Sequence, residues 1–271
     1  MSTYRFPSLF LSHGTPMHAF GEDSYQETLF QFASKMTKPK AIVFLSAHSV
    51  SSDQVHVLKT EQNWIQHDFN GFPEELYQIK YNCAGDPLLA DQIVALLTQS
   101  GFKAVTDLNA PLDHGIWIPL KNLYPKGDVP VVRVSLPLNI LPALVLKMGH
   151  ALAALREQGI MIVASGGAVH NLGDLKWSDK NGEGFPWAKQ FEEWLIRVLQ
   201  EKNVEELLAF EEFPGYFKAH PSNEHFLPIL FAVGATLPGD DAQSIFRGIE
   251  YGSLSMLCFS LNQSQKQQSL H

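Results

Sequence analysis

The sequence is poor in the features that define secreted and membrane proteins. Its two cysteines, Cys83 and Cys258, are too few for a disulfide framework or a paired-cysteine zinc motif, so we expect buried thiols in a reducing compartment. No apolar run approaches the roughly 20 residues that a membrane-spanning helix needs. The first residues, Met1–Phe6, lack the charged and apolar segments of a secretory signal. These absences predict a cytoplasmic protein that does not enter a membrane.

Positive charge is also scarce. Lys and Arg number 20 against 28 Asp and Glu, which gives a net charge of −8, and the basic residues are scattered along the chain. A protein that binds nucleic acid usually gathers basic residues into a patch, so this composition argues against such a partner. The sequence leaves the oligomeric state open.

No linker rich in Gly, Ser or Pro divides the chain, and no internal repeat is visible. With 271 residues, 45% of them hydrophobic and 18% charged, the chain falls in the range of folded globular proteins, which excludes disorder, collagen and coiled coil. We therefore expect one domain over residues 1–271, with a frayed tail over 262–271, where Gln and Ser dominate.

Several familiar enzyme motifs are missing. The sequence has no glycine-rich dinucleotide fingerprint and no P-loop, no Gly-x-Ser-x-Gly nucleophile elbow, and no His-Glu-x-x-His zinc motif. Nucleotide binding, a simple α/β-hydrolase mechanism and zinc-protease chemistry are therefore disfavoured.

Strand-like runs alternate with helical patterns, which is typical of an α/β protein. The expected strands are Ser8–Leu11, Ala41–Ser46, Gln54–Leu58, Lys103–Thr106, Val129–Leu136, Ile160–Ala164 and Leu254–Ser260. Helical spacing predicts helices over Pro87–Gln99, Leu141–Glu157, Pro186–Leu199 and Asn203–Phe210. Because several strands are continuously apolar, we expect a central mixed, largely parallel sheet covered by helices on both faces.

Histidine is the unusual residue, with eleven copies. His13, His48 and His170 each follow the end of a different expected strand, His225 opens an apolar helix-like segment, and His114 follows a carboxylate. Ligands of open α/β sheets bind beyond the carboxyl ends of the strands, so these side chains can converge. Neutral imidazole is a common metal ligand, and several in one cleft indicate one mononuclear metal site. The metal hypothesis does not include the other six: His18, His56, His67, His150, His220 and His271.

The motifs around these histidines occur in a specific order between about Leu9 and Leu261. They are Leu11–Met17, Ser46–His48, His67–Pro73, Asp113–Gly115, Ala164–Leu172, Asn223–Pro228 and Gly248–Met256. As a set, they resemble the class III, LigB-type, extradiol ring-cleavage dioxygenases, and in particular the 4,5-DOPA dioxygenase subgroup. Gly167-Ala168 and Gly173 depart from residues common in this family, and these departures bear on the substrate more than on the metal.

The resemblance implies a metal held by His13, His48 and His225. His170 is then the acid/base catalyst and a candidate fourth ligand, and His114 is a second catalytic histidine that faces the substrate or supports a ligand. Larger relatives use two histidines and a glutamate, so Glu224 competes with His225 as third ligand. We favour His225, because the subgroup is described with an all-histidine set.

The resemblance also suggests how a substrate is held. The loop residues His67, Asp68 and Phe69 would offer a flat aromatic wall with a polar tip to a catechol ring. Asp113 is grouped with them, and two interpretations of it stay open: it fixes the tautomer of His114, or it caps the helix that begins near Gly115.

These residues suit oxygenase chemistry. Fe(II) with three protein ligands leaves positions for a catechol and O₂, and His170, with an ordinary pKa of about 6.5, could exchange the protons. We expect an extradiol dioxygenase that converts a DOPA-like catechol to a ring-opened semialdehyde, with Fe(II) in the active form and Zn(II) plausible as isolated. The alternatives are a zinc-dependent hydrolase on the same scaffold and a catalytically inactive binding protein. The sequence leaves open the natural catechol and the bond cleaved.

Overall fold

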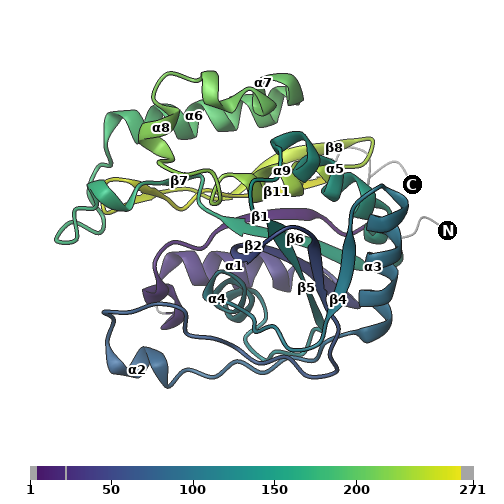
Figure 1. Ribbon diagram of the computed structural model, residues 1–271. Helices are drawn as coiled ribbons and strands as arrows, with labels where there is room; N and C mark the ends of the chain where they lie inside the picture. The colour runs from purple at the N-terminus through teal and green to yellow at the C-terminus, as the bar shows by residue number, and fades with distance from the viewer. Residues whose placement is uncertain (1–4, 22, 264–271) are drawn as a thin grey trace.

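The computed structural model describes residues 5–21 and 23–263, which form an α/β domain around an eight-stranded sheet (Figure 1). The strand order is β4-β3-β5-β2-β6-β1-β11-β8. Strands β5, β2, β6 and β1 run parallel in the centre, and antiparallel pairings join β3 to β5 and β11 to β1 and β8. The bounds are β1 Ser8–Ser12, β2 Ala41–Ser51, β3 Val55–Leu58, β4 Ala104–Asp107, β5 Val131–Pro137, β6 Ile160–Gly166, β8 Asp240–Phe246 and β11 Cys258–Gln263. The prediction of a mixed, largely parallel sheet is confirmed.

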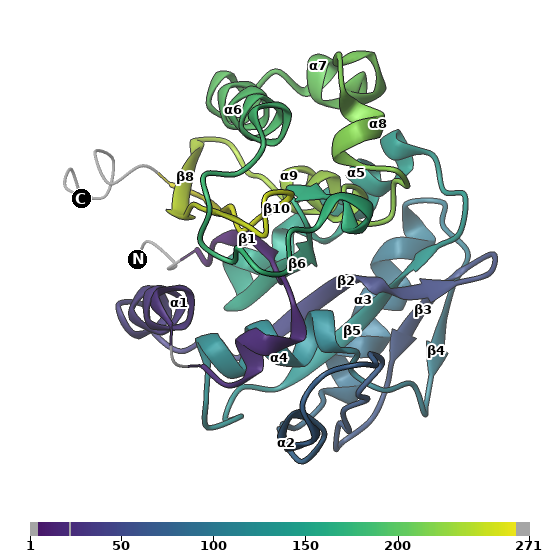
Figure 2. The same ribbon diagram turned by 90° about the vertical axis from the view of Figure 1, so that its left-hand side faces the viewer.

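Helices cover both faces of this sheet, as predicted. Alternate residues of β1 belong to different cores: Phe10 packs on one face, while Leu9 and Leu11 pack on the other. Figure 2 shows α1 and α4 on one side of the strands and α6 on the other. The helices are α1 Ser24–Ser34, α2 Glu74–Tyr77, α3 Pro87–Gln99, α4 His114–Leu123, α5 Pro142–Leu152, α6 Pro186–Glu201, α7 Val204–Leu208, α8 Tyr216–Ala219 and α9 Leu227–Gly234. None of those described combines the length and apolar character required to cross a membrane.

A second, three-stranded sheet was not predicted. It has the order β7-β10-β9, with β7 at Val169–His170, β10 at Leu254–Ser255 and β9 at Ile249–Glu250. The expected strand Leu254–Ser260 is therefore wrong as one element, because its first two residues join the small sheet and Cys258–Gln263 joins the main one. Strands of two residues are too short to show a period of two in the sequence.

Other differences lie at the ends of elements. The helix predicted over Leu141–Glu157 is an α-helix only to Leu152 and continues as a 3₁₀-helix to Gln158, where Gly159 (φ 93°) ends it. The helix predicted over Asn203–Phe210 is divided into α7 and the 3₁₀-helix Phe210–Glu212.

The prediction of a frayed tail over 262–271 is wrong at its first two residues. Asn262 and Gln263 belong to β11 and pair with Asp241 and Asp240 of β8, so these two residues are not frayed. Residues 264–271 lie outside the described residues. The extent of the domain over residues 1–271 stays a prediction.

Candidate metal centre

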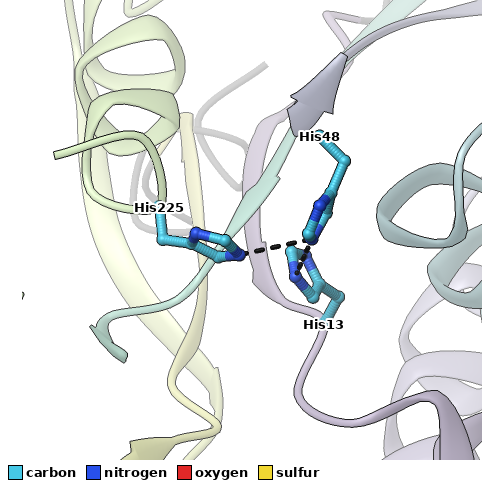
Figure 3. A group of neighbouring side chains, drawn as sticks. All are labelled: His13, His48 and His225. Atoms are coloured by element: carbon cyan, nitrogen blue, oxygen red, sulfur yellow. Dashed lines mark hydrogen bonds between the residues drawn. The ribbon is translucent and has the colours of Figure 1, made fainter. Parts of the chain in front are cut away.

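Three imidazoles meet at the carboxyl ends of the central strands. His13 follows β1, His48 lies in β2, and His225 precedes α9. The His48 Nε2 is 3.2 Å from the Nε2 of His13 and 3.3 Å from the Nε2 of His225 (Figure 3). Both β1 and β2 pair with β6 between them, so the parallel register brings residues 35 positions apart to one edge. The convergence expected from the strand ends is what the fold produces for these three histidines.

The three rings are neutral near pH 7. Burial, followed by repulsion from neighbouring histidines, holds the pKa of His13 and of His225 well below the ordinary value. Burial and the nearby His114 lower the pKa of His48 to about 4. A neutral imidazole has one nitrogen with a free lone pair, which is the form that binds a metal.

Hydrogen bonds on the opposite nitrogens orient two of these lone pairs. The His13 Nδ1 is 2.7 Å from the Ser165 Oγ, and the His225 Nδ1 is 3.3 Å from the Glu224 Oε1. An Nδ1–H that donates to the Glu224 carboxylate leaves the Nε2 of His225 as an acceptor, and the same tautomer of His13 donates to Ser165. Acceptor nitrogens about 3 Å apart repel one another unless a cation lies between them, so the donor set fits a divalent metal.

Glu224 lies behind His225, not among the three Nε2 atoms. Its Oε1 also accepts a hydrogen bond from the Ser222 Oγ at 2.8 Å. The carboxylate is not part of either group of close metal-binding atoms formed by the described residues. Of the two candidates for third ligand, the geometry favours His225.

A second group of donor atoms shares His48: it consists of His48, Asp68 and His114. The Asp68 Oδ1 accepts a hydrogen bond from the His114 backbone N–H at 2.9 Å, so this oxygen already has a partner. The group of three histidines is the better site for one ion, because its second nitrogens are oriented by Ser165 and Glu224.

His170, on β7, stacks face to face on His225. Their ring centroids are 3.5 Å apart and the planes differ by 5°. Burial, with His48 nearby, lowers the pKa of His170 to about 4, so the expectation of an ordinary value near 6.5 is wrong. Neither group of close donor atoms among the described residues includes His170, which favours an acid/base role over that of a fourth ligand.

His114, the first residue of α4, completes the histidine cluster. Its ring centroid is 4.1 Å from that of His48 and 5.4 Å from that of His13. The His114 Nδ1 lies 3.0 Å from the Asp68 Oδ1, an ion-pair distance at an angle too poor for a hydrogen bond. Asp68 is therefore the carboxylate beside this ring.

Asp113 takes the N-cap position of α4, as one interpretation expected, but its side-chain hydrogen bonds agree with neither interpretation. Its side chain makes no capping hydrogen bond, and the His114 Nδ1 has no hydrogen-bond partner among the described residues. Its oxygens instead accept from the Ser46 Oγ at 2.7 Å and the Ser49 Oγ at 2.5 Å. Since these serines flank His48 in β2, Asp113 positions the segment that carries this ligand.

The contacts beneath His48 form a buried network. The His48 backbone N–H donates to the Ser46 Oγ at 3.1 Å, and the Arg133 Nε donates to the Ser49 Oγ at 2.7 Å. At Gly115 there is no room for a side chain, because a Cβ would lie 2.4 Å from the Ser46 Oγ and 3.1 Å from the His48 ring. The hydrogen bonds of Ser46 and the close approach of Gly115 thus restrict the position of the His48 ring.

We expect Asp113→Asn to weaken metal binding about ten- to hundredfold, because an amide cannot accept from both serines as a carboxylate does. Competition with a coloured chelator would measure this. The exposed Asp53 offers the matched variant Asp53→Asn, which should bind metal as the wild type does. Equal affinity in the two variants would contradict the role given to Asp113.

The predicted substrate wall lies partly against the cluster. The Phe69 ring is edge-on to His114 at 5.7 Å and packs on Phe72 at 5.5 Å. His67 makes its contacts away from the metal-binding histidines: its Nε2 is 3.2 Å from the Ile79 carbonyl oxygen, and its ring packs on Trp117. The structure therefore brings Asp68 and Phe69 beside His114, and the role of His67 in substrate binding stays a prediction.

Sequence reasoning missed the partner of His13 and the serines around His48. Polar Ser46 and Ser165 at the ends of otherwise apolar strands are the signal that could have indicated them. It also missed His18, whose fully buried ring lies between the Asp23 Oδ2 at 2.9 Å and the Glu250 Oε2 at 3.1 Å.

His18 connects the segment after His13 to the small sheet. Leu254 of β10 is in register with Glu250 on one side and with His170 on the other. Burial lowers the pKa of His18, but the hydrogen bonds to Asp23 and Glu250 outweigh it and leave this pKa raised. The ion pair of His18 with Glu250 therefore holds β9 against the segment that follows the candidate ligand His13. Because β10 pairs with both β9 and β7, it holds β7 in place as well.

The stability contributed by His18 should depend on pH. A group whose pKa rises on folding stabilises the fold fully below its unfolded pKa, about 6.5, and loses this contribution as pH rises through the folded value. His18 lowers the pKa of the Asp23 carboxyl group. The Asp23 carboxylate therefore stabilises the fold above about pH 3.9, and this stabilisation is lost as the pH falls through the folded-state pKa.

We therefore expect His18→Phe to reduce the free energy of unfolding by about 1–3 kcal/mol near pH 6, and by less near pH 9. Urea unfolding of both proteins at the two pH values measures the difference. A loss that grows toward high pH would show that the ring is neutral in the fold.

Comparison with known proteins gives consistent matches over most of the chain. Residues 7–253 match the family described as the catalytic LigB subunit of aromatic ring-opening dioxygenase. The chain is 39% identical over 259 residues to the 4,5-DOPA dioxygenase extradiol of Beta vulgaris, which covers 92% of this chain and 93% of the relative. It is 37% identical over 261 residues to the protein of the same name from Escherichia coli (strain K12), with 95% of each covered. The crystal structure of an uncharacterized Escherichia coli K12 protein matches with a TM-score of 0.80 and 33% identity, over 95% of this chain and 100% of that one.

Proposed function

Because the chain belongs to the LigB family of aromatic ring-opening dioxygenases, we propose that it is a metal-dependent extradiol dioxygenase that opens a catechol next to its diol with O₂. The family assignment confirms the resemblance of the ordered sequence motifs. The observation that supports the proposal within this chain is the meeting of three neutral imidazoles, with their Nε2 atoms 3.2 and 3.3 Å apart.

In the proposed enzyme, His13, His48 and His225 hold the metal. A ferrous ion there would supply open positions for a chelating diol and for O₂, and a path for electrons between them. Burial shields two of the three ligands from water, since His13 is 2% and His225 5% exposed, whereas His48 is partly exposed.

His170 is proposed to move the protons. As a neutral base it accepts a proton from one catechol hydroxyl at its free ring nitrogen. Because burial lowers its pKa to about 4, the resulting imidazolium is a stronger acid than an ordinary imidazolium and can return the proton to an oxygen atom of the substrate. His114, with Asp68 beside its Nδ1, is proposed to orient the bound diol, and Phe69 to pack against the catechol ring.

Oxygen uptake tests this function. Protein stripped of metal and reloaded anaerobically with Fe(II) should consume O₂ with 4-ethylcatechol, L-DOPA or related catechols and form a yellow ring-opened product. Zn(II)-loaded protein is the control and should consume none. The absence of uptake by Fe(II)-loaded protein across a broad catechol panel would contradict the proposal.

The all-histidine donor set favours one second candidate, a zinc-dependent hydrolase. Three histidines are also the ligands of zinc enzymes that convert water to hydroxide near neutral pH. Zinc-restored ester or amide cleavage without O₂ would support this alternative. A catalytically inactive binding protein is disfavoured, because the chain retains each histidine that the resemblance requires.

A further inference from the structure

A cavity of about 380 Å³ is lined by the segment that follows His48 and the segment that precedes His225. One wall comes from the ends of β2 and β5 and the turn after β5, and the other from the segment before α9. Its volume lies in the range of pockets for small molecules, about 300–1,000 Å³. The apolar side chains that line it are Val50, Leu136, Leu138, Ile140 and Leu227.

The segments that carry two of the three candidate metal ligands contribute to its walls, whereas the histidines themselves do not line it. Val50 follows His48 by two residues in β2 and pairs with Leu136 of β5. Glu224, which precedes His225 and lies 3.3 Å from its Nδ1, lines the other wall. Glu224 is therefore the residue through which the cavity meets the metal-binding histidines.

Glu224 carries the charge of this cavity. Among the described residues that line it, Glu224 is the ionisable one, and neither Lys nor Arg contributes to the walls. Its Oε1 accepts from Ser222 and His225, whereas its Oε2 has no hydrogen-bond partner in the described part of the chain. The side chain is 40% exposed, so a ligand can approach it.

The partly buried Arg133, which contacts Ser49 in the network around His48, does not offset this charge. Arg133 donates through its Nε to Ser49 and already faces the carboxylates of Asp113, Asp107 and Asp68. A carboxylate substituent placed in the cavity would therefore meet Glu224 without a compensating base on either wall, and two like charges at close range repel each other.

We infer that this cavity receives the substituent of the catechol ring, and that Glu224 selects substituents that carry a cationic amine over those that carry a carboxylate. The inference rests on the proposed function. The apolar walls accommodate the methylene groups of a short arm, and the ammonium at its end hydrogen-bonds to the free Oε2 of Glu224. Glu224 is thus a specificity-determining residue.

Three catechols with arms of similar length test the inference: dopamine (cationic), 4-ethylcatechol (neutral) and 3-(3,4-dihydroxyphenyl)propionate (anionic). Because a hydrogen bond to a charged group contributes about 1.5–3 kcal/mol, we expect kcat/KM for dopamine to exceed that for the propionate at least about tenfold. The neutral compound should lie between them. Anaerobic calorimetry on Fe(II)-loaded protein should give the same order of affinities.

Glu224→Gln should reduce the preference for dopamine over the propionate to within about twofold, since the amide hydrogen-bonds to both ends without a net charge. The exposed Glu193 of α6 provides the matched control, because Glu193→Gln removes the same charge elsewhere and should keep the preference. Metal content is measured for each variant, so that a loss of ligand geometry is separated from a loss of selectivity.

A second variant tests the cavity without changing its charge. Leu138→Trp, at a half-exposed lining position, should lower the affinity for dopamine relative to unsubstituted catechol. An unchanged ratio would overturn the cavity as the place of the arm, and equal affinities of the cationic and anionic catechols would overturn the role of Glu224.

The two proposals fail differently. Oxygen uptake with 4-ethylcatechol but no dependence on arm charge would overturn the inference and leave the dioxygenase proposal standing. No uptake with any of the three, together with charge-dependent binding in the calorimeter, would overturn the dioxygenase proposal and leave the selective cavity.

Discussion

His48→Ala should lose bound metal and all metal-dependent oxygen uptake. The His48 Nε2 is the atom close to both other ligands, at 3.2 and 3.3 Å, so its removal leaves the two remaining nitrogens without a complete donor set. If three or four ligands share a metal-binding free energy of about 10–16 kcal/mol, one ligand contributes enough to change the affinity roughly a hundred- to ten-thousandfold. Metal content after gel filtration with a weak chelator, and oxygen uptake with a catechol, measure the loss.

His150 offers the matched control for this variant. It lies on the exposed side of α5, so His150→Ala removes an imidazole without changing the cluster and should retain metal. His225→Ala should lose metal as His48→Ala does, whereas Glu224→Gln should retain most of it. Metal retained in His225→Ala and lost in Glu224→Gln would show that the carboxylate is the third ligand.

The sequence could indicate this centre because His13 and His48 each lie at or beyond the carboxyl end of an apolar stretch, and that can be recognised in each segment separately. A histidine after an apolar strand lies at the ligand-binding edge of a parallel sheet wherever that strand is placed. The rule gives the edge but not the neighbours. The Ser165 partner of His13 depends on the pairing of β1 with β6, in which Leu11 is opposite Ser165, and no property of either segment alone specifies this register.

Asp113 shows why the other contacts could not be predicted. Both sequence interpretations used partners within two residues of it, the His114 ring and the helix start near Gly115. In the fold its carboxylate binds Ser46 and Ser49, which are 67 and 64 positions away. A carboxylate can satisfy local and distant donors equally well, so only the packing of α4 on β2 decides between them.

The missed strands have a related cause. β8 has a polar sequence with several half-exposed residues, because it lies at the edge of the sheet, where it pairs with one strand, β11. Strands β7, β9 and β10 are held by pairing with one another. Their positions nevertheless matter for the site, since β7 carries His170, and the pKa of this histidine depends on burial that the sequence does not show.

His170→Phe should keep the metal and lose turnover. The phenyl ring can still stack on His225, where the imidazole now lies at 3.5 Å, so the ligand keeps its neighbour. It cannot accept or return a proton, and the loss of a general acid/base typically lowers the rate by about 10²–10⁴. Metal analysis and oxygen uptake on the same Fe(II)-loaded sample measure the two effects.

His170→Ala is the comparison that separates proton transfer from packing. If the ring acts only by supporting His225, the phenylalanine variant should be active and the alanine variant should lose metal. If His170 is a ligand, both variants should lose metal to a similar degree. Retained metal with little turnover in His170→Phe is expected only when the missing function is the proton transfer. The control variant is His56→Ala, in β3 and outside the cluster, which should keep both metal and activity.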